Sequence, residues 1–252
     1  MLVVLFNLIQ PLGWRVGLYR VEDVAIGCAV SLVVGLLFWP RGAAAALRQA
    51  IAEAYQESAR YLASAVEFAV ACCDASGPWR PAPDEEALQA AAASRRLDDT
   101  FRGFLAERGA KPVPLADVTA LLSGVVGLRL AADAVLELWR GDDDRPGGDR
   151  SAARQELLMS TARVSGWYED LALSLIGTRE VPAPLERDIL SDKRLVDSLR
   201  RDFVGADGAA SATAVRMIWT GDHLDAARRL QWLLVGPAGA ATEQLVPRGP
   251  FV

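Results

Sequence analysis

Few residues of this chain have the type and spacing that chemistry requires. Cys72 and Cys73 are adjacent, and a vicinal thiol pair can bind a soft metal ion. Neighbours on one helix point in different directions, however, which favours two small packing residues and makes a disulfide between them strained. His223 is the single histidine, and its helical spacing from apolar residues predicts a place in a core or an interface. That predicted stripe consists of Val215, Trp219, His223, Ala226 and Leu230.

These residues do not form a known catalytic or metal-binding pattern. A zinc site needs several Cys or His ligands at set spacing, and a catalytic triad needs a nucleophile beside a base. The acidic run at 142–144 lies in a Gly-Pro linker, where a solvated loop is expected. We therefore predict no catalytic residue, no cofactor and no bound metal, and we do not expect an enzyme.

The composition argues against disorder and against nucleic-acid binding. Of 252 residues, 52% are apolar and 23% are charged, and the formal net charge is −5. A disordered chain has fewer apolar residues, and a protein that binds phosphates usually carries a basic stripe. We expect no nucleic-acid partner. The three cysteines provide no secreted-type disulfide framework, which fits a reducing compartment for the soluble part.

One segment concentrates the apolar residues. Positions 24–39 carry no charge, and as a helix they extend about 24 Å at about 1.5 Å per residue. The hydrocarbon core of a bilayer is about 30 Å thick. Extension to 22–40 brings the helix close to that length and places Trp39 at the interface. We predict a transmembrane helix over 22–40; a buried helix of a soluble core is the alternative.

The residues before this span predict the end of an earlier one. The apolar run at 1–9 is too short to cross a bilayer, and it lacks the basic start and the cleavage site of a signal peptide. We interpret 1–10 as a stub of a spanning helix and 11–21 as the connection to the next. The membrane domain would then cover 1–41, and the chain would be incomplete at its start.

The remainder predicts one helix after another, without a strand signal, so that the fold class is all-α. The run over 115–139 is strongly apolar, but charged residues recur along it at depths where a bilayer would penalise them. We therefore predict that it is the central helix of a soluble bundle. We expect a helical domain over 42–236 and a disordered tail over 237–252. The other expected helices are 47–72, 84–107, 151–176, a charged one after Pro184 up to Phe203, and 211–235; in the charged helix Leu185, Ile189, Val196, Leu199 and Phe203 should face inward.

A cluster of residues marks the two ends of the expected span. Arg20 and Asp23 lie directly before it, Gly27 lies one turn inside, and Trp39 and Pro40 close it. Ionisable residues at a membrane boundary can simply fix the depth of a helix. They can also form ion pairs along a substrate or proton path. Spacing alone leaves both roles open, and these five residues are the candidate site.

The same residues carry a family resemblance. The pattern R-V-E-D-V-A-I-G at 20–27, which continues into V-V-G-L-L-F-W-P at 33–40, resembles the closing transmembrane helix of fusaric acid resistance (FUSC-type) proteins, which include aromatic carboxylic acid exporters. In that family an Arg-x-x-Asp element opens the last helix of the membrane domain and an aromatic-Pro pair ends it. Val24 and Ala25 stand here where Thr-Leu is frequent. The stretch at 214–224 is similar to the final helix of the family's cytoplasmic region.

The resemblance implies the C-terminal part of an inner-membrane exporter of aromatic or other small organic acids, with the helical domain in the cytoplasm. Its partners would be the lipid bilayer, further transmembrane helices of the same or an associated chain, a small aromatic acid substrate and other copies of itself. The alternative is a single-pass, membrane-anchored helical protein that binds a partner. Arginines are balanced on the two sides of the span, so charge alone does not orient it.

Overall fold

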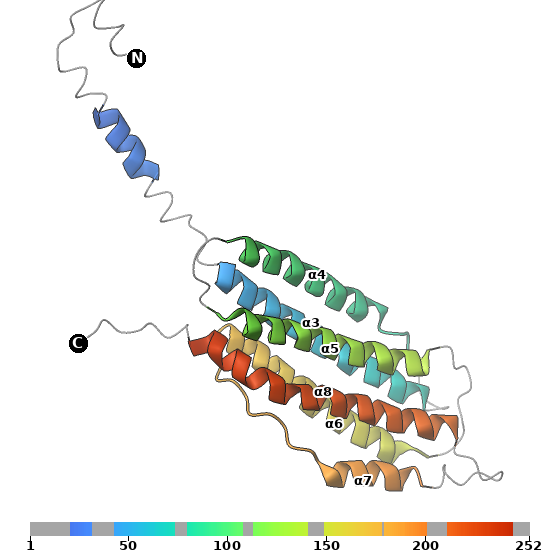
Figure 1. The fold of residues 1–252 in the computed structure, drawn as a ribbon. Coiled ribbons are helices and arrows are strands. Elements are labelled where there is room, and N and C mark those ends of the chain that lie inside the picture. Colours follow the sequence, from blue (N-terminus) through green and yellow to red (C-terminus); the bar gives the residue numbers. More distant parts are fainter. Residues whose placement is uncertain are drawn as a thin grey trace, which may run out of the picture. The chain divides into compact units, whose positions relative to one another are not determined.

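All regular structure in the described part of the chain is helical, as the sequence predicts. The computed structural model describes residues 21–31, 43–73, 80–107, 113–140, 149–177, 179–200 and 211–243, and no strand occurs within these ranges. A helix over 21–31 precedes six labelled helices (Figure 1), which are α3 (Ala43–Cys72), α4 (Asp84–Ala106), α5 (Leu115–Trp139), α6 (Ser151–Leu175), α7 (Ile189–Ser198) and α8 (Ala212–Thr242). The chain divides into two compact units, Met1–Gly42 and Ala43–Val252.

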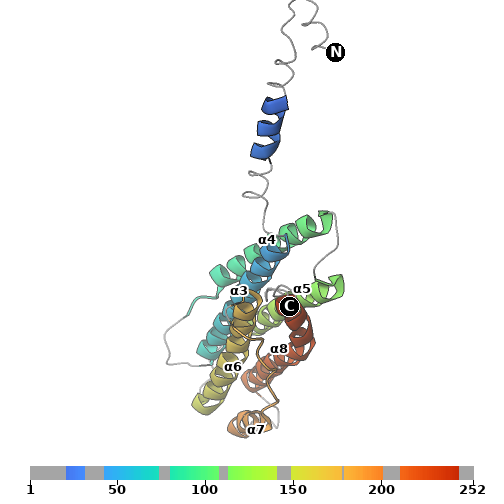
Figure 2. The same ribbon diagram turned by 90° about the vertical axis from the view of Figure 1, so that its left-hand side faces the viewer.

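Four of the helices in the second unit form a closed ring. Helix α3 packs against α5 and α6, and α8 packs against the same two helices from the other side. Helix α4 adds to this ring by packing on α3, and α7 packs on α6 and α8 (Figure 2). The result is a four-helix bundle with two flanking helices, and each ring helix therefore needs an apolar stripe on its inner side.

Helix α3 buries one regular stripe of residues. Its apolar residues recur at steps of four and three, which places them on one side of a helix. The stripe members Leu47, Ile51, Ala54, Ser58, Tyr61 and Ala65 are buried, while Phe68 and Cys72 are partly buried at the end of the helix.

Helix α5 occupies the range that the sequence predicts and lies between α3 and α8. Its buried residues include Val118, Leu128 and Val135. Arg129 and Asp133, one turn apart, lie 4.0 Å from each other at its half-buried edge. A central helix of a bundle accounts for both features.

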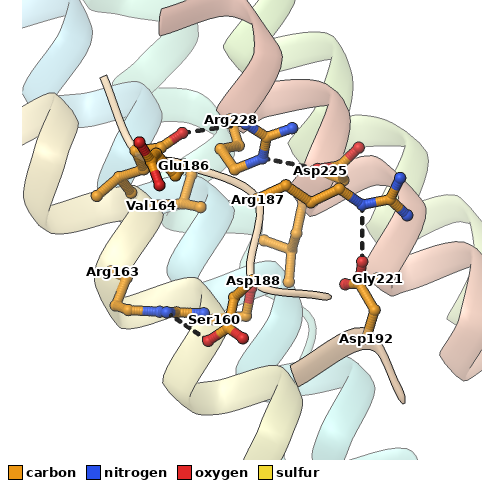
Figure 3. Close-up of a pocket in the computed structure, with 12 residues that line it drawn as sticks. Ser160, Arg163, Val164, Glu186, Arg187, Asp188, Asp192, Gly221, Asp225 and Arg228 are labelled. Carbon is orange, nitrogen blue, oxygen red and sulfur yellow. Dashed lines mark hydrogen bonds and ion pairs between the residues drawn. The ribbon is translucent and has the colours of Figure 1, made fainter. Parts of the chain in front are cut away.

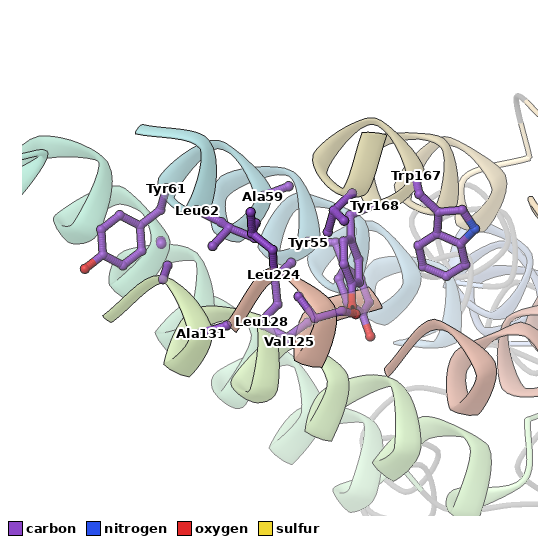
Figure 4. Packing of buried hydrophobic residues seen from close by; sticks show 14 of the residues in the cluster. Tyr55, Ala59, Tyr61, Leu62, Val125, Leu128, Ala131, Trp167, Tyr168 and Leu224 are labelled. Atoms are coloured by element: carbon purple, nitrogen blue, oxygen red, sulfur yellow. Dashed lines mark hydrogen bonds between the residues drawn. The ribbon is translucent and has the colours of Figure 1, made fainter. Parts of the chain in front are cut away.

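Two buried tyrosines hold pairs of ring helices together (Figure 4). The Tyr55 hydroxyl on α3 donates a hydrogen bond of 2.7 Å to the Leu121 carbonyl on α5. The Tyr168 hydroxyl on α6 donates one of 2.7 Å to the Ala227 carbonyl on α8. Buried hydroxyls require such partners, and here each partner is backbone of a neighbouring helix.

The charged helix after Pro184 differs from the prediction. Residues 179–188 are not helical, and α7 begins only at Ile189, where the Asp188 side chain accepts a hydrogen bond of 2.9 Å from the Ser191 amide. This cap sets a buried face through Ser191, Leu195 and Leu199. The predicted inward orientation is therefore wrong for Ile189 and Val196, which are 70% and 48% exposed. Leu185 and Leu199 do lie inward, and Phe203 lies outside the described residues.

The last helix also differs, because it is longer than predicted. Helix α8 continues through Pro237 to Thr242, so the first residues of the expected disordered tail are helical. Proline removes one backbone donor, but Ala238 and Ala241 beyond it are buried in the core. Alanine has the best helix propensity, and this burial adds to it. The rest of the tail, 244–252, lies outside the described residues.

The buried stripe of α8 is not the one that the sequence predicts. Val215 and Trp219, expected with His223 in a core or an interface, are 39% and 51% exposed and so lie outside the core. The buried face instead includes two polar residues that have partners. Trp139 Nε1 donates to Thr220 Oγ1 at 3.0 Å, and the Leu185 amide donates to Gln231 Oε1 at 2.8 Å. The buried residues of α8 are Thr213, Ala214, Met217, Thr220, Leu224, Ala227, Gln231, Leu234, Ala238 and Ala241.

Candidate functional site

Two of the five predicted boundary residues lie in the described helix over 21–31. Asp23 and Gly27 are both exposed there, one turn apart. A Cβ atom added at Gly27 would meet nothing within 4 Å, so this side of the helix has room for a close neighbour. Arg20, Trp39 and Pro40, and most of the segments 1–10, 11–21 and 32–40, lie outside the described residues.

The helix over 21–31 presents apolar side chains in several directions. Every residue in it is exposed, and Val21, Val24, Ile26 and Val30 are between 56% and 67% exposed. Because successive residues are rotated by about 100°, these four side chains do not share one face. Apolar surface on all sides of a helix is unfavourable in water. Among the residues that the structure describes, none covers these side chains, and an apolar environment would suit them.

A second feature is a polar pocket in the bundle, where residues 179–188 pass α6 and α8 (Figure 3). Its volume is about 50 Å³, which is enough for a few water molecules, whereas ligand sites usually measure about 300–1,000 Å³. Its lining comes from α6 (Ser160, Arg163, Val164), the connecting segment (Leu185, Glu186, Arg187, Asp188), α7 (Asp192) and α8 (Gly221, Leu224, Asp225, Arg228).

Three arginines of the pocket each bind a carboxylate within it (Figure 3). Arg163 lies 2.9 Å from Asp188, Arg187 lies 2.8 Å from Asp192, and Arg228 lies 2.7 Å from Asp225. The amide of Ser191 and then the Arg163 guanidinium lower the pKa of Asp188. Asp192 raises the pKa of Arg187 in turn. Each of these arginines is paired with a carboxylate of the pocket. This pairing favours a structural role over the binding of an anion.

Further contacts show how side chains at the pocket hold the backbone of residues 179–188. Arg228 Nη1 donates to the Leu185 carbonyl at 3.0 Å, on the same residue whose amide Gln231 binds. Trp167 Nε1 donates to the Ala183 carbonyl at 2.7 Å. Side chains from α6 and α8 thus satisfy the backbone of a segment that has no helix or sheet bonds of its own. The pocket residues hold segment 179–188 against the bundle. They lie far apart along the chain, so no spacing in the sequence predicts the pocket.

The vicinal thiols are packing residues in the structure. Cys73 is buried and its thiol donates to the Ala69 carbonyl at 3.3 Å. Burial raises the pKa of the Cys73 thiol to about 12. A thiol that keeps its proton is a poor nucleophile and a poor metal ligand. Among the residues that the structure describes, no group of three or more His, Cys, Asp or Glu side chains could hold a metal ion.

One described helix, α5, is long and apolar enough to cross a membrane by length and composition alone. A core helix of a soluble bundle passes the same test, and the packing of α5 between α3 and α8 fits that interpretation.

No model of a known protein family, no curated protein and no solved structure matches this chain.

Proposed function

We propose that this chain is the C-terminal part of an inner-membrane transporter, in which helix 22–40 spans the bilayer and the bundle from Ala43 lies in the cytoplasm. The observation that supports this most directly is a contrast between the two units. The helix over 21–31 exposes every one of its residues, whereas the bundle buries a large apolar core and leaves only part of its apolar residues exposed. A bilayer, together with neighbouring spanning helices, would remove the surface of the first unit from water.

The charged surface of the bundle supports the proposal that water surrounds the second unit. Ion pairs on its exterior join neighbouring helices, such as Arg140 on α5 with Asp84 on α4 at 3.1 Å. Arg96 on α4 pairs with Glu53 on α3 at 2.5 Å. Such charges are stable where water and salt surround them, and they would be costly in lipid.

The substrate class follows from the resemblance of residues 20–40 to FUSC-type proteins. We propose an aromatic or other small organic acid as the exported molecule. In this account Asp23, at the membrane boundary, pairs with a cation or a proton on the transport path. The open side of Gly27 receives another transmembrane helix, because a small residue lets two helix backbones approach closely.

The test compares two carboxylates one residue apart. In cells that express the complete reading frame, Asp23→Asn should lower the export of a labelled aromatic acid and leave the amount of inserted protein unchanged. Glu22→Gln is the matched control, since it removes a neighbouring negative charge at a variable position of the Arg-x-x-Asp element. Equal loss of export and insertion in Asp23→Asn, or equal effects of the two variants, would return Asp23 to a structural role.

The alternative function is that of a single-pass, membrane-anchored helical protein that binds a partner. It is favoured by large apolar side chains that remain exposed on the bundle, among them Trp219 and Leu233 on α8. The reading frame upstream of Met1 separates the two: further in-frame apolar segments of about twenty residues support the transporter. An in-frame stop codon close to Met1 supports the single-pass protein.

A further inference from the structure

Helix α8 has a second stripe on the side away from the core. Val215, Trp219 and Leu233 are 39%, 51% and 67% exposed, and Asp222 and Arg229 are exposed between them. The positions Val215, Trp219, Asp222, Ala226, Arg229 and Leu233 follow one another at alternating steps of four and three, the spacing of residues that face a partner helix in a coiled coil.

The bundle does not cover this stripe. Its residues alternate along α8 with the buried set that contacts α5 and α6. Leu230 lies at the border between the buried face and this stripe, because it reaches α5. A Cβ atom added at Gly127 of α5 would lie 2.8 Å from the Cδ1 atom of Leu230. Beyond Leu230 the stripe faces outward. Trp219 and Leu233 remain 51% and 67% exposed, although the Trp219 ring lies 6.3 Å, centroid to centroid, from the His223 ring of its own helix. An exposed apolar stripe at coiled-coil spacing is typical of an interface.

The order of residues in the stripe is self-complementary. Counted outward from Ala226, Trp219 and Leu233 stand seven residues away on either side, and Asp222 and Arg229 stand four and three residues away. When two copies of the helix run antiparallel about Ala226, the Trp219 of one copy lies beside the partner's Leu233. Asp222 then lies beside the partner's Arg229, so that unlike charges meet twice. A parallel pair would place Asp222 against Asp222 and Arg229 against Arg229, which repel one another.

We propose that a second copy of this chain covers the outer face of α8, with the two α8 helices antiparallel and the two-fold axis at Ala226. A symmetric dimer uses the same patch on both subunits, as this stripe requires. The small side chain of Ala226 lets the helices approach at the axis. Arg229 also pairs with Asp225 on its own helix, and Asp225 binds Arg228 at 2.7 Å as well. Arg229 can therefore turn to the partner's Asp222 while Asp225 keeps a cation.

The stripe also indicates the strength of the contact. From Val215 to Leu233 it extends over about 27 Å at about 1.5 Å per residue. Trp219 supplies most of its apolar area, since a tryptophan can bury about 150–250 Å². One helix pair is smaller than an obligate interface of more than about 2,000 Å². We therefore expect a dimer that dissociates on dilution, with Trp219 as its main energetic contributor. This proposal does not depend on the transporter function.

Disulfide capture tests the geometry in the full chain, purified in mild detergent. The background carries Cys28→Ser and Cys72→Ser, and the buried Cys73 remains. With a mild oxidant, Ala226→Cys should give a covalent dimer, because residue 226 meets its own copy at the axis. Trp219→Cys alone should not, since its two copies lie about 21 Å apart at about 1.5 Å per residue. A mixture of Trp219→Cys and Leu233→Cys chains should give a covalent dimer that contains one of each. The background chain is the control.

Charge exchange tests the same pairing without cysteines. Asp222→Arg and Arg229→Asp each place like charges together twice in the dimer, and each should raise the dissociation constant about tenfold. The double variant restores unlike charges and should return the dissociation constant to within about threefold of the original. Sedimentation velocity over a range of protein concentrations measures all four chains. An exposed surface position that served no interface would not show this recovery.

Three results would overturn the proposal. A chain that stays monomeric at high concentration would leave the face to a lipid surface or to another protein. Covalent dimers from Trp219→Cys alone, at the level of Ala226→Cys, would indicate a parallel pair. Single charge variants that dimerise as the original chain does would place the dimer contact on another surface.

Discussion

Tyr55 and Tyr168 stack against each other in the centre of the bundle, with ring centroids 5.7 Å apart and ring planes inclined by 18°. Tyr55 comes from α3 and Tyr168 from α6, and their hydroxyls bind backbone carbonyls of α5 and α8. This single pair of side chains therefore contacts all four ring helices. Such offset stacks add about 0.5–1.5 kcal/mol to the free energy of burial.

Removal of one buried hydroxyl should destabilise the bundle. Tyr168→Phe keeps the stacked ring and deletes the donor to the Ala227 carbonyl, so we expect the free energy of unfolding to fall by about 1–2 kcal/mol. Urea unfolding followed by circular dichroism at 222 nm measures the change. Tyr61→Phe is the control: its hydroxyl donates to Asp133 at 2.8 Å, and that carboxylate is 45% exposed, so water can replace the bond. Equal losses in the two variants would contradict the role of Tyr168.

Replacement of two glycines by alanine distinguishes the contribution of helix propensity to stability from that of packing. Each Gly→Ala change inside a helix favours folding by about 1 kcal/mol when there is space. At Gly124 a Cβ atom would lie 2.3 Å from the Tyr55 hydroxyl and 2.6 Å from Leu234 Cδ2, so Gly124→Ala should destabilise the chain by about 1–3 kcal/mol. At Gly103 it would meet nothing within 4 Å, and Gly103→Ala should stabilise it. Thermal unfolding of both variants measures the two effects, and stabilisation by Gly124→Ala would show that α3, α5 and α8 pack differently.

The buried thiol predicts a loss of stability in alkali. Burial raises the pKa of Cys73 from 9.0 to about 12 in the folded chain. The unfolded chain therefore gives up the thiol proton first, and the free energy of unfolding falls as the pH rises from about 9 to about 12, by about 1 kcal/mol per pH unit. Urea midpoints at several pH values measure this. Cys73→Ala should show a shallower fall, because the tyrosines that also titrate are common to both chains. Parallel curves would mean that the thiol is accessible to water.

Much of the bundle was predictable because its ring helices bury regular stripes. In α3 and α5 the residues at steps of four and three form the buried stripe, although Val126 and Leu130 of α5 remain exposed, and the bounds 115–139 agree with α5. Proline marked where α4 and α5 begin, since Pro83 and Pro114 directly precede them. Periodicity and helix breakers are local properties, and they suffice where a helix has one apolar face.

Helix α8 has two such faces, and the stripe predicted from its sequence is not the one that is buried. Its core face includes Thr220 and Gln231, whose polarity argues for the outside until Trp139 and the Leu185 amide are known to bind them. The outer face carries Trp219 and Leu233, which argue for the inside. Hydrogen-bond partners outside α8 determine which face of α8 is buried, and the spacing of residues along α8 does not predict those partners. The pocket around Arg163 and Arg228 was missed for the same reason.

The membrane-boundary site remains a prediction from the sequence. Asp23 and Gly27 lie on an exposed helix, and Arg20, Trp39 and Pro40 lie outside the described residues. The self-complementary stripe of α8 and the apolar helix over 21–31 share one property. Each displays apolar side chains that stay exposed among the residues that the structure describes.

Extraction of cell membranes tests the central proposal most directly. Membranes from cells that express the full chain are washed with alkaline carbonate, which strips peripheral proteins, and then treated with a mild detergent. We predict that the chain stays in the membrane pellet through the wash and dissolves only in detergent. A chain that remains in the supernatant of a high-speed spin without detergent, as a single monodisperse species, would contradict a membrane-spanning helix and the transporter proposal with it.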